Sequence, residues 1–222
     1  MSADPERLDR TRLLAARLRA AHDRPYLATA LFALTVVESA HVSTMGVDRH
    51  WRCHVNAGFV ARTPVAELAG VWIHEIAHLL RDHHGRAAAL PYPHLLINIA
   101  QDCEINDDLI ADGLVLPAGL QTPQRYGLPP GRLFEEYLPQ LPTTVVTSGH
   151  DCGSGAHGVE RSWEKAPGGM RRAEAESLRR DTARRIREHV RGRGTVPAGW
   201  RRWAERLLEP RVDWRQQLAG GI

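Results

Sequence analysis

Cysteine is scarce in this chain. Its three cysteines, Cys53, Cys103 and Cys152, are an odd number, and they form neither a disulfide framework nor a CxxC pair. We therefore expect reduced thiols and a cytoplasmic protein, rather than a small secreted domain that disulfides hold together. The missing CxxC pair also argues against a separate metal site built from Cys103 and Cys152.

Long hydrophobic runs are also missing. The most apolar stretch, residues 26–40, is shorter than the roughly 20 residues that a membrane-spanning helix requires. The first 20 residues carry charges of both signs and lack the apolar segment and cleavage site of a signal peptide. We therefore expect neither a membrane protein nor a secreted one, and we interpret the apolar stretch as a buried helix.

The sequence has no strong excess of one charge sign. It contains 29 Lys and Arg against 26 Asp and Glu, which gives a formal net charge of +3. Arginines crowd residues 171–193, but carboxylates are mixed with them and no known nucleic-acid-binding module is present. Nucleic acid is therefore not an expected partner. With 43% apolar residues, the chain can bury a core and should be globular.

Helical patterns outnumber strand patterns along the chain. Apolar residues alternate within residues 44–63, around a turn signal at residues 56–58, which predicts short strands and a small sheet. Thr63 and Pro64 predict the start of a helix that Gly85 would end. The sequence thus predicts a mostly helical α+β fold. The expected helices span residues 5–22, 26–39, 64–84, 93–110, 168–190 and 196–218, with a short one within 129–141.

The segment HEIAHLLRDHH, residues 74–84, contains the pattern HExxH. His74 and His78 are four residues apart, so both imidazoles project from one face of a helix and can reach a single metal ion. Glu75 would lie beside that ion, suited to take a proton from a water molecule that the metal activates. The pattern predicts two metal ligands and a catalytic base. The alternative is a core helix whose histidines are satisfied by hydrogen bonds.

A catalytic zinc ion usually has three protein ligands and one water molecule. Asn98, Asp102 and Asn106 follow one another at intervals of four residues and form a polar stripe on an apolar helix. We therefore predict Asp102 as the third ligand, with Asn98 and Asn106 as residues that support the ligands. Glu104 shares its face with Gln101 and Asp108, a face that we expect to be solvated, and it stays as an alternative ligand.

His84 offers a different third ligand. It lies ten residues after His74, the offset of the third histidine in HExxHxxGxxH. That motif requires a glycine at the position that Arg81 occupies here, so His84 is a less favoured alternative. His83 and His84 are better explained as residues that the helix dipole favours at a C-terminus. One of them, His83, is a candidate for supporting the site.

Other motifs occur in a fixed order around HExxH. With them the chain resembles the predicted metallopeptidase domain of bacterial proteins that carry a C-terminal von Willebrand A-like domain and often accompany MoxR-type ATPases. The resemblance covers most of the chain. It implies a zincin-like metallopeptidase fold with a small β-sheet beside the HExxH helix, zinc bound by His74, His78 and an acidic residue of the Asp102 helix, and Glu75 as the base. The motifs are VDRHWRCHVNAGFV, HEIAHLLRDHHGR, NIAQDCEIND, LPAGL, FEEYL, CGSGAHG and VPAGWRRWAERLLEPRVDWRQQL.

The resemblance also leads to expectations about domains and function. Residues 1–165 would form the metallopeptidase domain, and residues 166–222 an Arg-rich helical extension that packs on it or leads to a C-terminal domain missing from this sequence. The expected function is zinc-dependent hydrolysis of peptides or proteins, through a metal-bound water that Glu75 activates. The alternative is a catalytically silent zinc-binding adaptor that works with a MoxR-type ATPase or a von Willebrand A-like partner.

Two further expectations concern the substrate. In zincins the strand before the metal helix pairs with an extended peptide, so a strand within residues 50–60 is expected to have a free edge. His150 and His157 lie in a glycine-rich segment and are candidates for stabilising the oxyanion that forms during hydrolysis. Histidines in such a loop are more often on the surface without a role.

Overall fold

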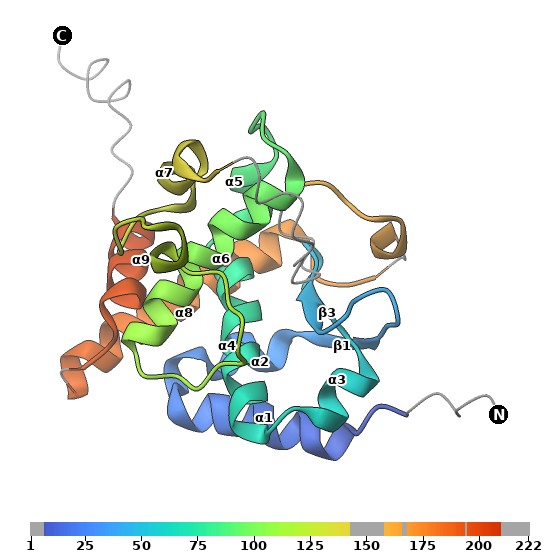
Figure 1. Cartoon of the computed structure of the whole chain (residues 1–222). Helices are drawn as coiled ribbons and strands as arrows, with labels where there is room; N and C mark the ends of the chain where they lie inside the picture. The colour runs from blue at the N-terminus through green and yellow to red at the C-terminus, as the bar shows by residue number, and fades with distance from the viewer. Residues whose placement is uncertain (1–6, 143–157, 166–167, 194, 210–222) are drawn as a thin grey trace, which may run out of the picture.

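The computed structural model describes residues 7–142, 158–165, 168–193 and 195–209. Helices dominate it and accompany a three-stranded sheet, which confirms the predicted α+β class (Figure 1). No helix within the described ranges is long and apolar enough to cross a membrane. The longer helices are α1 (Arg10–Asp23), α4 (Val65–Leu80), α6 (His94–Ala111), α8 (Arg172–Arg193) and α9 (Ala198–Leu208). The shorter elements are η1 (Pro25–Leu27), α2 (Ala28–Ala33), β1 (Thr35–Glu38), β2 (Met45–Val47), β3 (Arg52–Val55), α3 (Ala57–Arg62), α5 (His83–Ala87), η2 (Pro123–Tyr126), α7 (Phe134–Tyr137), η3 (Leu138–Gln140) and η6 (Ser162–Lys165).

The sheet has the order β1-β3-β2, with β1 parallel and β2 antiparallel to β3. All four residues of β3 are buried. Because β3 is the central strand, both of its edges are already paired. The prediction of a free edge within residues 50–60 is therefore wrong, and the outer strands of this sheet are β1 and β2.

The predicted helix at 26–39 is only half correct. Helix α2 ends at Ala33, and the chain then enters strand β1. Thr35, Val36 and Val37 are β-branched residues, whose stiff side chains favour strands. They pair in parallel register with residues 52–54 of β3. Pairing with a distant segment, which the local apolar pattern does not show, decides between helix and strand here.

Asn56 begins a helix and does not form a hairpin turn. Its side-chain oxygen accepts a hydrogen bond from the backbone N–H of Phe59 at 2.9 Å, so it caps the N-terminus of α3. Residues 57–62 are therefore helical, and the second strand predicted there is absent. Asparagine favours both turns and helix N-caps, which is why the local signal was ambiguous.

Helix α4 carries the HExxH pattern and is buried from Leu68 through Leu80. It ends four residues before the predicted end at His84, because Asp82 adopts a left-handed backbone conformation with φ of 52°. Gly85 lies within the following helix α5, where a Cβ atom would come 2.5 Å from the Asp82 carboxylate. Arg179 of α8 fixes the end of α4 by donating a hydrogen bond to the Leu79 carbonyl at 2.7 Å.

The helices and the sheet enclose two clusters of buried apolar side chains. The larger cluster joins α1, the sheet and α4 to α8 and α9, and the smaller one lies between α6, α5 and α7. Helix α6 contributes to both, with Ile105 and Leu109 in the larger cluster and Leu96 and Ile99 in the smaller one. Figure 1 shows α4 in the centre, with the sheet on one side and α9 on the other. The facing surfaces of α4 and α6 are therefore held in the interior.

Candidate metal centre

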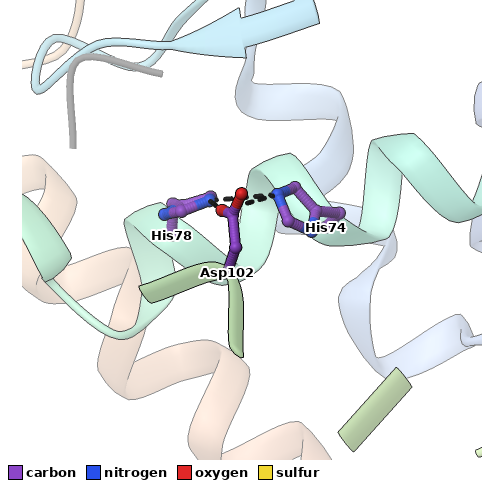
Figure 2. Close-up of side chains that lie close together, drawn as sticks. All are labelled: His74, His78 and Asp102. Atoms are coloured by element: carbon purple, nitrogen blue, oxygen red, sulfur yellow. Dashed lines mark hydrogen bonds and ion pairs between the residues drawn. The ribbon is translucent and has the colours of Figure 1, made fainter. Parts of the chain in front are cut away.

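Two buried helices bring together the three residues that the sequence predicted as metal ligands. Helix α4 supplies His74 and His78, and α6 supplies Asp102. Figure 2 shows the Asp102 carboxylate reaching between the two imidazoles. The three residues are 7%, 1% and 5% exposed, so water can screen their charges only weakly. Among the described residues, these three form a group whose ligand atoms are close enough to share one ion.

The three donor atoms form a nearly equilateral triangle. The Nε2 atoms of His74 and His78 are 3.1 Å apart, and Asp102 Oδ1 lies 3.4 Å from the first and 3.3 Å from the second. A tetrahedral zinc ion with bonds of 2.0–2.1 Å places neighbouring ligand atoms about 3.3 Å apart. The donor types and their spacing therefore fit a divalent ion such as zinc.

Each imidazole has a partner at its other nitrogen. His74 Nδ1 lies 2.8 Å from Asn106 Oδ1, and Asn106 Nδ2 donates to the Gln121 carbonyl at 2.9 Å. His78 Nδ1 lies 3.0 Å from His83 Nδ1. An acceptor at Nδ1 keeps the proton there and leaves Nε2 available for a metal, as in many metal sites of proteins. Asn106 and His83, two of the predicted supporting residues, thus contact the histidines.

The charges of the cluster are strongly coupled. Burial alone would raise the pKa of Asp102, but contact with the two histidines holds it well below its usual range. Burial alone would lower the pKa of His74, yet the carboxylate of Asp102, helped by Glu75, raises it to about 9. Burial lowers the pKa of His78 despite Asp102. At neutral pH the carboxylate is therefore ionised, His78 is neutral and His74 is protonated, so an ion that binds here must displace the proton of His74.

Glu75 lies beside the cluster and is 2% exposed. It follows His74 directly on α4 and lines a pocket of about 190 Å³ together with His74 and Asp102. The buried carboxylate therefore faces a space that can hold a water molecule or part of a ligand. This is the place that the HExxH pattern predicts for a base, although the pattern alone does not show that a pocket exists.

The remaining wall of this pocket comes from residues 116–121, which contain the LPAGL motif. Residues 116–121 lie over α4, and they approach it closely because Gly70 has no side chain: a Cβ atom there would clash with the Val115 carbonyl. This segment contributes apolar residues to the lining of the pocket, as do α3 and α4. The full lining is Ser43, Thr44, Phe59, Val71, His74, Glu75, Asp102, Asn106, Leu116, Pro117, Ala118, Gly119, Leu120 and Gln121.

The prediction that Glu104 lies on a solvated face is wrong. It is 6% exposed and accepts hydrogen bonds from Arg81 at 3.0 Å, Arg86 at 3.2 Å and the backbone N–H of Phe134 at 2.9 Å. Helices α5 and α7 cover this side of α6, and the two arginines neutralise the carboxylate. Glu104 therefore lies outside the group of three donor residues.

The other candidates have different outcomes. His84 is half-buried on α5, outside the group of three. Asn98 is buried on α6, one turn before Asp102. The position that requires glycine in the three-histidine motif holds Arg81, and the backbone turns instead at Asp82. His150, His157 and Cys152 lie outside the described residues, whereas Cys53 and Cys103 are free and buried.

Comparison with known proteins gives a family and no individual relative. Neither a curated protein nor a solved structure matches the chain. Residues 9–222 match the model of a protein family described as "Putative metallopeptidase domain". The match includes both helices of the candidate metal centre and extends over nearly all of the sequence. The chain therefore belongs to this metallopeptidase-domain family.

Proposed function

We propose that the protein is a zinc-dependent metallopeptidase of zincin type. The observation that carries the proposal is the triangle formed by His74 Nε2, His78 Nε2 and Asp102 Oδ1, whose edges of 3.1–3.4 Å match those of a tetrahedral zinc site. His74, His78 and Asp102 would hold the ion, which when bound would lower the pKa of a water molecule to roughly 7 and polarise a carbonyl group.

Glu75 is the proposed general base. Its carboxylate lines the same pocket as His74 and Asp102, so it lies where the attacking water and the peptide carbonyl must meet. It takes the proton from the water and delivers it to the nitrogen of the leaving amine as the peptide bond breaks. The surrounding buried helices exclude bulk water, which strengthens the interaction of these charges.

The pocket favours substrates with an apolar side chain next to the scissile bond. Its lining includes the apolar residues Phe59 and Val71 together with Leu116, Pro117 and Leu120. The polar residues His74, Glu75 and Asp102 line the same space. An extended peptide would place one apolar side chain in this space and its carbonyl group near the base.

The substitution Glu75→Gln tests the mechanism. It removes the base but keeps the size of the side chain, so we expect unchanged zinc stoichiometry and a loss of hydrolysis of about 100-fold or more. The assay follows new amino termini, by mass spectrometry, in a mixture of synthetic peptides and in unfolded casein. Glu67→Gln, on the first turn of the same helix, is the matched control and should cleave as the wild type does.

Two results would contradict the proposal. One is zinc-loaded wild-type protein that cleaves none of these substrates, and the other is a Glu75→Gln variant that cleaves as fast as the wild type. The first result would favour the alternative, a catalytically silent zinc adaptor acting with a MoxR-type ATPase or a von Willebrand A-like partner. A purely structural zinc site usually has four protein ligands and does not need a neighbouring carboxylate, so the arrangement of Glu75 favours catalysis.

A further inference from the structure

A second layer of buried polar residues lies behind His78. His83, the first residue of α5, is fully buried, and its Nδ1 atom lies 3.0 Å from Nδ1 of His78. Its other nitrogen, Nε2, has no acceptor at normal hydrogen-bond distance within the described residues. The carboxylate oxygen Oε2 of Glu104 lies 3.5 Å from this nitrogen. His83 therefore stands between a candidate metal ligand and a buried negative charge.

The short distance between the two Nδ1 atoms restricts where the protons can be. A neutral imidazole carries one N–H, and a hydrogen bond needs one donor and one acceptor. If His78 binds an ion through Nε2, its proton must be on Nδ1, and His83 Nδ1 must accept it. The proton of His83 is then on Nε2, directed at Glu104. Only this order of protons satisfies both rings when an ion is bound.

Glu104 is held rigidly enough to enforce this order. Three groups from three different elements donate hydrogen bonds to its carboxylate: Arg81 after α4, Arg86 of α5 and the backbone N–H of Phe134 at the start of α7. Arg86 is in turn bound by Glu135 at 2.8 Å. The Phe134 ring also packs against the His83 ring, with 5.2 Å between the ring centres. His83 cannot turn away without disturbing several contacts.

We propose that His83 and Glu104 are positioning residues of the metal centre, which hold the His78 imidazole in the tautomer that leaves Nε2 free for the ion. This inference rests on the proposed metal centre. The two ligand histidines are then supported differently: His74 by the neutral amide of Asn106, and His78 by a second imidazole that faces a carboxylate. The Glu104 carboxylate at the end of this chain favours a proton on Nε2 of His83, which leaves His83 Nδ1 free to accept the proton of His78.

The first test measures zinc affinity by competition with a coloured chelator. His83→Leu removes the acceptor and should weaken zinc binding by about 10- to 100-fold. His83→Asn places an amide oxygen near the former Nδ1 atom and should restore most of the affinity. Glu104→Gln keeps the shape but removes the charge and should give an intermediate loss. His22→Leu, an exposed histidine on α1, is the control and should bind as the wild type does.

The second test reads the geometry without hydrolysis. In the Co²⁺-loaded protein, the visible spectrum reports the ligand arrangement, and His83→Leu should change it while the melting temperature of the metal-free protein stays close to that of the wild type. In the zinc-loaded wild type, long-range ¹H–¹⁵N spectra should show the proton of His78 on Nδ1 and that of His83 on Nε2. This measurement needs no variant and so does not depend on the folding of one.

The outcomes separate this inference from the proposed function. A His83 proton on Nδ1, or unchanged zinc affinity and Co²⁺ spectrum in both His83→Leu and Glu104→Gln, overturns the inference even if the wild type cleaves peptides. Weakened zinc binding in these variants supports it even if no peptide is cleaved. A wild-type protein that binds no stoichiometric metal overturns both.

Discussion

At the scale of single residues, Asp102 holds the cluster together. Its carboxylate contacts both imidazoles, at 3.4 and 3.3 Å, and it comes from a different helix than they do. We expect Asp102→Ala to lower the affinity for zinc by roughly 100-fold or more, because the ion would keep only two of its three protein ligands. Isothermal titration with zinc measures the loss. Asp107→Asn is the control, because the Asp107 carboxylate accepts a hydrogen bond from the backbone N–H of Gly131 and lies outside the group of three donor residues. Equal zinc affinities of the wild type and Asp102→Ala would exclude Asp102 as a ligand.

The sequence was informative about this residue because of a local pattern. Asp102 lies in a polar stripe with Asn98 and Asn106, and all three are buried. Glu104, two residues further, is also buried, but its role depends on Arg81 and Arg86, which belong to other elements. A helical pattern shows which residues share a face, and it does not show what covers that face.

At the scale of elements, the contact between α4 and the segment after α6 shapes the pocket. Gly70→Ala would normally stabilise a helix by up to about 1 kcal/mol. Here the new Cβ atom would meet the Val115 carbonyl and lie 2.9 Å from Leu116 Cδ2. We therefore expect a net loss of unfolding free energy of about 1–3 kcal/mol and a raised KM for peptides with an apolar side chain.

A glycine in another helix provides the control. Gly192 lies near the end of α8, and a Cβ atom there would have no neighbour within 4 Å. Gly192→Ala should leave the unfolding free energy unchanged or slightly raise it. Urea denaturation of both variants compares them directly. Equal effects at the two positions would show that the contact between Gly70 and Val115 does not limit the packing of this segment.

At the scale of the whole molecule, stability in acid depends on a buried carboxylate far along the chain from the metal centre. Asp48 accepts hydrogen bonds from Arg52 at 2.7 Å and shares one with His54 at 3.0 Å, and its side chain is fully buried. Burial alone would raise the pKa of Asp48, but these partners hold it below its usual value. Its stabilising contribution is therefore present above the unfolded pKa of about 3.9 and is lost as the pH falls through the lower folded pKa.

This predicts a pH-dependent effect of Asp48→Asn. At pH 7 the variant leaves Arg52 without its charged partner and should lose about 3 kcal/mol of unfolding free energy. The difference from the wild type should shrink as the pH falls below about 4. Denaturation curves at several pH values measure it. Asp181→Asn, which breaks an exposed pair with Arg184, should change little, and a difference for Asp48→Asn that does not vary with pH would refute the assignment.

The partners of the arginines in the C-terminal helices are visible only in the whole molecule. Arg179 binds Asp82 and the end of α4, and others pair with carboxylates on their own helix. Helices α8 and α9 share the larger core cluster with α1 and α4. Four of these arginines therefore pair with carboxylates of the protein itself, in line with the mixed composition of the segment. The pairs at the start of α8 and within it are Arg171–Glu174, Arg172–Glu176 and Arg184–Asp181.

The features that depend on a single helix could be predicted from the amino-acid sequence. The spacing of His74, Glu75 and His78 places them on adjacent turns of α4, and the stripe that includes Asp102 points into the interior. Contacts between distant segments show that β1 is a strand, that His83 lies between His78 and Glu104, and that the absence of a side chain at Gly70 lets Val115 approach α4. Backbone pairing, coverage of a helix face and close packing all join segments distant in sequence, and a local pattern carries no information about them.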